Sequence, residues 1–131
     1  MSLPDTEPLH PAAEPSVIRH AAGVAAGGIA GTVANALMIA IFLPVSAIAL
    51  MASPGRYVVG IVLAAALPFL FRRLGGVLGW VAGVVLLSVL ATLLAKLFFG
   101  GEGTWSAALA FNAVYALACV LIYRYVAYGR A

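Results

Sequence analysis

The residues of this chain that could form a binding site are few, uncharged and set within long apolar runs. Seven polar side chains share this setting: Thr32, Asn35, Ser46, Ser88, Thr92, Asn112 and Tyr115. Their amides and hydroxyls donate and accept hydrogen bonds. They can hold a polar group or tie two helices together, and that is the chemistry we expect of them.

Three of these residues are expected at the same depth in the membrane. Counting about 1.5 Å per helical residue, Asn35, Ser88 and Asn112 reach the same level in a hydrocarbon core roughly 30 Å thick. An asparagine that faces lipid is unfavourable, so we expect Asn35 and Asn112 to face protein and to bond each other or Ser88. Two interpretations stay open for this polar tier: hydrogen-bonded glue between helices, or a polar constriction or small site in the outer half of the membrane.

Signatures of enzymes and metal sites are missing from the sequence. It holds no Ser/His/Asp set, no carboxylate pair at catalytic spacing, no phosphate-binding loop and no metal motif. No acid, histidine or arginine is expected in the middle of a span, and Lys96 should snorkel from a span's end. We therefore expect neither an enzyme nor a proton-coupled transporter, and no cofactor or metal.

The histidines and the cysteine of this chain could be reactive, but the sequence predicts that they are not. His10 and His20 lie in or beside the polar N-terminal segment and are expected to be solvated or interfacial. The only cysteine, Cys119, cannot form a disulfide within one chain, and its apolar surroundings predict a buried, unreactive thiol.

The composition sets the class of protein. The chain has 131 residues, of which 65% are hydrophobic and 8% charged, and its mean hydropathy is +1.14. A soluble domain carries about 25% charged residues, so this chain predicts an integral membrane protein. Its seven cations are scattered between apolar runs rather than clustered on a stripe, which excludes a nucleic-acid partner.

The apolar runs predict an all-α fold. Four transmembrane helices joined as two hairpins are expected from the runs 21–52, 57–71, 74–99 and 105–123. Turns are expected at "SPGR", 53–56, and at "GGEGTWS", 100–106. Residues 1–20 are polar and rich in proline, and are expected to form a flexible cytoplasmic tail ahead of a transmembrane domain, 21–131.

The basic residues predict the orientation. With four spans, one side of the membrane holds five cations: Arg19, Arg72, Arg73, Arg124 and Arg130. The other side holds Arg56 and Lys96. By the positive-inside rule, both termini should be cytoplasmic in a multi-pass protein of the plasma (inner) membrane.

Two lines of glycine at helical spacing suggest close helix packing. Gly23, Gly27 and Gly31 form one line, and Gly75, Gly79 and Gly83 form a second line at a constant offset in the sequence. Small residues let helix backbones approach closely in lipid. We expect the first helix to pack on the third inside the bundle, or either line to pack on another copy. The offset leaves both a duplication and a chance match open.

Two basic and aromatic stretches, "FLFRRLGG" at 69–76 and "LIYRYVAY" at 121–128, are similar to the hairpin ends of GtrA-type proteins with four spans. That resemblance implies a role in translocating polyprenyl-linked sugars. The asparagine that usually precedes the arginine is replaced by Phe71 and Tyr123, so no family is assigned.

These observations favour two functions. The first is an accessory, anchoring or assembly subunit of a larger membrane complex, because the spans are uncharged and the loops are too short for a soluble active site. The alternative is a small homo-oligomeric carrier or channel for a neutral solute or a lipid-linked head group. The expected partners are the lipid bilayer and other membrane subunits or copies of the same chain.

Overall fold

The computed structural model describes residues 15–98, 100 and 103–129, and this part of the chain is helical without strands. Four helical spans in it are long and apolar enough to cross a membrane: Val17–Phe42, Pro54–Arg73, Gly76–Phe98 and Trp105–Tyr128. The predicted all-α class, with four helices able to cross a membrane by length and composition, is confirmed for the described residues. The predicted tail falls largely on residues 1–14, which lie outside the described residues.

The first span, α1 (Val17–Phe42), begins four residues before the predicted boundary at 21. The Ser16 hydroxyl caps it by accepting a hydrogen bond from the Arg19 backbone N–H at 3.3 Å, so residues 17–20 are helix rather than tail. α1 ends at Phe42 because Leu43 precedes Pro44 and takes an extended conformation. The short α2 (Ala47–Met51) follows, capped by Ser46.

The second span is broken into two helices. α3 (Pro54–Ala64) starts at Pro54, a residue that suits the first position of a helix. The turn expected at 53–56 is therefore wrong, because Pro54 to Arg56 form the first turn of α3. α3 gives way to α4 (Leu67–Arg73) at Ala65 and Ala66. Pro68 has no N–H to donate to the Ala64 carbonyl, which explains the break.

The third and fourth spans complete the bundle. The third is α5 (Gly76–Leu93), which continues as the π-helix η1 (Leu94–Phe98). The fourth is α6 (Trp105–Tyr128), whose first residues are capped by Thr104. α6 packs along both α1 and α5, while α3 packs on α1 and α4 packs on α5.

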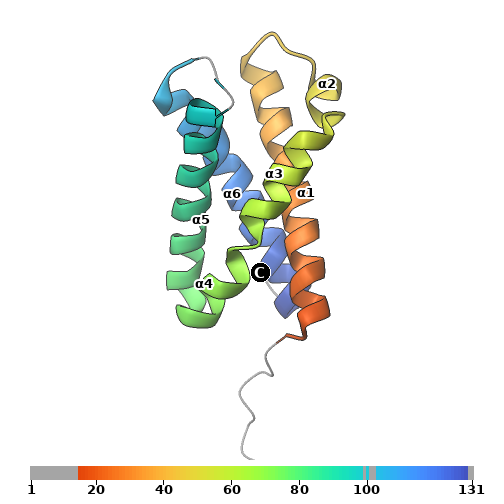
Figure 1. Ribbon diagram of the computed structural model, residues 1–131, viewed down its shortest axis with the longest axis vertical. Coiled ribbons are helices and arrows are strands. Elements are labelled where there is room, and N and C mark those ends of the chain that lie inside the picture. The colour runs from red at the N-terminus through yellow and green to blue at the C-terminus, as the bar shows by residue number, and fades with distance from the viewer. Residues whose placement is uncertain (1–14, 99, 101–102, 130–131) are drawn as a thin grey trace, which may run out of the picture.

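The two ends of the bundle differ in shape. Figure 1 shows α5 on one side and α1 with α3 on the other, set apart at the end that carries α2, while α4 crosses between them at the opposite end. We call these the α2 end and the α4 end. The first residues of α1 and the last of α6 meet at the α4 end, where Gly129 adjoins Arg19.

The first glycine line lies against α6, not against the third span. A Cβ added at Gly27 would stand 2.7 Å from the Cys119 carbonyl oxygen, and one at Gly31 would stand 2.6 Å from the Tyr115 ring. Gly23 faces Tyr123 in the same way. The expected pairing of the first and third spans is therefore wrong, because the tyrosines of α6 fill this glycine face.

The second glycine line has different surroundings. A Cβ at Gly79 would stand 2.7 Å from the Phe71 ring of α4, and one at Gly83 would stand 3.1 Å from Leu67. Gly75 caps α5 with a φ of 63° and has open space where a side chain would lie. The two glycine lines have the same spacing in the sequence, but the first packs on α6 and the second packs mainly on α4.

Candidate functional site

A cavity of about 650 Å³ opens at the α2 end between α1, α2 and α3 on one side and α5, η1 and α6 on the other. We call it the α2-end cavity. Its apolar lining comes from Leu50, Val59, Leu63, Ala91, Leu94 and Ala95, among others. Its polar lining comes from Thr32, Asn35, Ser53, Arg56, Asn112 and Tyr115. The cavity therefore offers both an apolar wall and a polar end.

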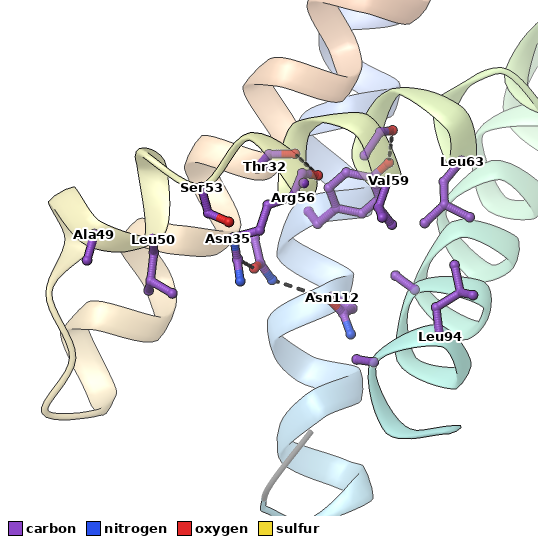
Figure 2. Close-up of a pocket in the computed structure, with 15 residues that line it drawn as sticks. Thr32, Asn35, Ala49, Leu50, Ser53, Arg56, Val59, Leu63, Leu94 and Asn112 are labelled. Atoms are coloured by element: carbon purple, nitrogen blue, oxygen red, sulfur yellow. Dashed lines mark hydrogen bonds between the residues drawn. The ribbon is translucent and has the colours of Figure 1, made fainter. Parts of the chain in front are cut away.

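Four polar side chains form a connected row across helices α1, α3, α5 and α6, and three of them also line the cavity. Arg56 Nη2 donates a hydrogen bond to Asn35 Oδ1 at 2.5 Å. Asn35 Nδ2 donates to the Phe111 carbonyl at 2.8 Å and to Asn112 Oδ1 at 3.4 Å. Asn112 Nδ2 in turn donates to Thr92 Oγ1 at 3.2 Å. Figure 2 shows Arg56, Asn35 and Asn112 side by side, with Leu94 across the cavity. We call Asn35, Arg56, Asn112 and Thr92 the polar row.

The two asparagines of the polar row lie well inside their helices. Asn35 is seven residues before Phe42, the last residue of α1, and Asn112 is seven residues after Trp105, the first residue of α6. At about 1.5 Å per residue, both amides lie about 10 Å from those helix ends. Because Arg56 is bonded to Asn35, its guanidinium is drawn to the same depth.

One hydrogen bond and one close polar contact hold α3 against the other helices beside the cavity. The Tyr115 hydroxyl donates to the Gly60 carbonyl at 2.5 Å. The Thr32 hydroxyl donates to the Gly28 carbonyl at 2.7 Å and lies 3.5 Å from the Arg56 carbonyl. Gly60 adjoins Thr32 so closely that no side chain would fit there. The backbone of α3, and with it Arg56, is positioned by α1 and α6.

Arg56 is a cavity-lining residue that the sequence does not single out. The expected turn at the outer boundary is wrong for Arg56, whereas its place near the start of the span Pro54–Arg73 leaves the expectation of no arginine in the middle of a span uncontradicted. Arg56 lies in the first turn of α3, is partly buried, and its Nε is buried without a hydrogen-bond partner. Pro54, a common first residue of helices, was the signal in the sequence that could have placed it there.

The structure separates Ser88 from the two asparagines. The Ser88 hydroxyl donates to the Val84 carbonyl of its own helix at 2.6 Å. Thr92, one turn further along α5, is the residue that accepts from Asn112. Of the two alternatives expected for the asparagines, the structure has the bond between Asn35 and Asn112 and not a bond to Ser88, because serine in a helix satisfies its hydroxyl on the carbonyl four residues back.

A second polar group lies at the α4 end, in a cluster of aromatic rings formed by His20, Phe71, Tyr123 and Tyr128. His20 Nδ1 lies 2.7 Å from the Tyr123 hydroxyl, and the histidine is only 7% exposed. The Arg124 guanidinium lies 4.8 Å from the centre of the Phe71 ring and 4.7 Å from that of Tyr128. We call these five residues the aromatic cluster.

The aromatic cluster corrects one expectation about histidine. His20 was expected to be solvated or interfacial and is buried instead, because Tyr123 supplies a hydrogen bond and a stacked ring. His10 lies outside the described residues.

Two other reactive or charged residues were considered from the sequence, Cys119 and Lys96. Cys119 is fully buried on α6 beside Gly27. Lys96 of η1 donates a hydrogen bond to the Gly103 carbonyl and lies 6.0 Å from the centre of the Trp105 ring. In the part of the chain that the structure describes, no group of three or more His, Cys, Asp or Glu residues could hold a metal ion.

Comparison of the chain with protein-family models, with curated proteins and with solved structures finds no match. The features of the molecule that bear on its function are therefore the α2-end cavity and the polar row beside it.

Proposed function

We propose that this chain is a small carrier of the inner (plasma) membrane that binds an amphiphilic molecule in the α2-end cavity. The observation that carries the proposal is a cavity of about 650 Å³ with an apolar wall and one polar end. Ligand sites in proteins span about 300–1,000 Å³ and combine an apolar lining with a few convergent polar groups. A molecule with an apolar body and a polar head matches both parts of this lining.

Irregular helices beside the cavity support a transport role. The second span is broken between α3 and α4, and the third span ends in the π-helix η1, whose Leu94 and Ala95 line the cavity. Transporters commonly build their sites from discontinuous membrane helices. π-Helical turns occur frequently at functional sites.

The orientation that we propose places the cavity in the outer half of the membrane. Both termini would be cytoplasmic, with the spans joined as two hairpins, because the positive-inside rule assigns the α4 end to the cytoplasm. Arg56 lies within a span, so it no longer counts as a loop cation of the outer side. The charge bias toward the α4 end is therefore stronger than the sequence count.

Filling the cavity tests the proposal. Gly55 lines the cavity, and a Cβ added there meets nothing within 4 Å, so Gly55→Phe should fold and occupy the space. Val58→Phe is the matched control, because Val58 is 61% exposed on the same helix. Native mass spectrometry of protein extracted from its own membrane should show a retained amphiphile on the wild type and Val58→Phe, and none on Gly55→Phe. Equal retention by all three proteins would refute the proposal.

The accessory-subunit function remains a second proposal. The described residues include no group of three or more His, Cys, Asp or Glu residues that could hold a metal ion, which is compatible with a subunit that only anchors or assembles. The two glycine lines, however, are largely occupied by side chains of the same chain, which removes them as ready contacts for other subunits. Mild detergent extraction separates the two functions: co-purification with unrelated subunits supports an accessory role, and a chain alone or with its own copies supports a carrier.

A further inference from the structure

We propose that Arg56 is the anion-binding residue of the α2-end cavity, and that the ligand carries a phosphate or carboxylate group on an apolar tail. The inference rests on the proposed function, because it names the ligand class of the same cavity. It replaces the neutral solute considered from the sequence with an acidic amphiphile.

The first argument is the charge on Arg56. Its guanidinium stays protonated in proteins and has five N–H donors. Among the described residues, its side chain has one hydrogen-bond partner, Asn35, and its Nε is buried without any. A charge withdrawn from water is costly unless it is paired. Because the Nε is buried, the unused donors that a ligand in the cavity could reach are those of the Nη atoms not bonded to Asn35.

The second argument is that no carboxylate side chain among the described residues neutralises Arg56. The chain has four carboxylate side chains, and all of them lie outside the described residues: Asp5, Glu7, Glu14 and Glu102. The groups that surround Arg56 in the cavity are amides, hydroxyls and aliphatic side chains. An oxyanion on the ligand would supply the missing negative charge.

The third argument is geometric. Asn35 is held by the Phe111 carbonyl and by Asn112, and its own Oδ1 holds Arg56 Nη2. Asn35 is therefore a positioning residue that holds the Nη2 atom of the guanidinium at the cavity wall (Figure 2). A planar guanidinium matches the two oxygens of a phosphate or carboxylate through parallel hydrogen bonds, which a lysine cannot do.

The fourth argument is size. The cavity is much larger than an isolated phosphate, and Leu50, Val59, Leu63 and Leu94 form an apolar wall beyond Arg56. Burial of apolar surface would stabilise a hydrocarbon tail against this wall. We therefore assign the oxyanion to the head of an amphiphile rather than to a free ion.

The experiment compares two lipids with the same tails. Dioleoyl phosphatidic acid has a phosphate head and dioleoylglycerol has none, and each is titrated onto the purified full chain and followed by native mass spectrometry. The wild type should bind phosphatidic acid at least about tenfold more tightly than the neutral lipid. Arg56→Gln should weaken phosphatidic acid binding roughly ten- to hundredfold, since hydrogen bonds to charged groups contribute about 1.5–3 kcal/mol.

Two further variants keep the test decisive. Arg73→Gln removes an exposed cation at the α4 end and should leave the affinity unchanged. Arg56→Lys keeps the charge but not the planar fork, and should lose several-fold in affinity even if Arg56→Gln fails to fold. Equal losses in Arg73→Gln and Arg56→Gln would overturn the assignment to Arg56.

The arms of the experiment distinguish the possible failures. Equal affinity of the wild type for the two lipids would overturn the anionic ligand and leave the proposed carrier standing. Binding of neither lipid would overturn both. Displacement of phosphatidic acid by inorganic phosphate at millimolar concentration would keep Arg56 as the anion site but assign the ligand to a soluble phosphate compound.

Discussion

Arg56 at the α2 end and Arg124 at the α4 end are similar cations in opposite surroundings. Each has a guanidinium whose Nε is buried without a hydrogen-bond partner. Arg124 is covered by the rings of Phe71 and Tyr128, at 4.8 and 4.7 Å. Arg56 has no ring over it among the described residues and lines a cavity of about 650 Å³.

The difference shows how an apolar bundle can use a positive charge in two ways. Aromatic rings attract a desolvated cation by roughly 2 kcal/mol or more, so Arg124 is stabilised by its own chain. Arg56 has one amide and an open space, so the remaining stabilisation must come from outside the chain. The α4 end is a packed structural junction, and the α2 end is the part of the molecule suited to a ligand.

The largest expected effect on the free energy of unfolding is at Gly27, which is tightly packed, and we compare it with Gly55, which adjoins open space. Gly27→Leu would force a side chain within 2.7 Å of the Cys119 carbonyl and should lower the free energy of unfolding by about 3 kcal/mol or more. Gly55→Leu at the cavity should change it by less than about 1 kcal/mol, because a Cβ there meets nothing within 4 Å. Unfolding by dodecyl sulfate in mixed micelles measures both. Equal stability of the two variants would disprove the tight packing of α1 on α6.

The next effect compares the two arginines directly. Arg124→Gln removes two cation–ring contacts and should lower the free energy of unfolding by about 2 kcal/mol. Arg56→Gln removes a charge without a full set of partners, so the ligand-free protein should be equally stable or more stable. The same micelle titration on both variants decides the matter, and a larger loss for Arg56→Gln than for Arg124→Gln would reverse the roles assigned to the two ends.

A smaller effect is expected within the polar row. Asn112→Leu removes the hydrogen bonds to Asn35 and Thr92 and should lower the free energy of unfolding by about 1–2 kcal/mol. Its size-exclusion profile and its affinity for phosphatidic acid separate the two interpretations of these amides. Weaker binding with intact assembly supports a site, whereas loss of assembly with normal binding by the surviving protein supports glue between helices.

The smallest effect concerns the buried histidine. Tyr123→Phe keeps the ring that fills the α1 glycine face and removes only the hydroxyl bonded to His20. The expected loss is about 0.6 kcal/mol, the average for a hydrogen bond between membrane helices. Tyr125→Phe is the control, since Tyr125 is 64% exposed, and it should leave the stability unchanged. A loss above that of Asn112→Leu would mean that the aromatic cluster depends on this bond more than on packing.

The four spans could be predicted because their apolar runs are long and follow from hydropathy alone. The depth of Asn35 and Asn112 could be counted for a similar reason: rise per residue is constant in a helix. Arg56 could not be placed by these rules, because "SPGR" suits both a turn and the first turn of a helix. The contact that holds Arg56 is with Asn35, an acceptor 21 residues away, and the local sequence does not reveal it.

The partners of the glycine lines were also beyond sequence patterns. Spacing shows that a face is smooth, but not which side chain fills it. The ring of Tyr115 and the backbone at Cys119 fill the face of α1, and Phe71 fills that of α5, through shape complementarity across long separations. The alternative bond from the asparagines to Ser88 does not form for a local reason, because the Ser88 hydroxyl already donates to the Val84 carbonyl of its own helix.

The interruption of the second span at Ala65 and Ala66 has a mechanical consequence. With the Ala64 carbonyl deprived of its usual donor by Pro68, bending at this joint would cost less than bending a continuous helix. If its hydrogen bonds to Tyr115 and Asn35 open, α3 can swing about this joint, which would change the distance from Arg56 to Leu94 while Phe71, beyond the joint, kept its place beside Arg124. Under the proposed carrier function, a ligand could then enter and leave the α2-end cavity while the packing of the aromatic cluster at the α4 end stayed unchanged.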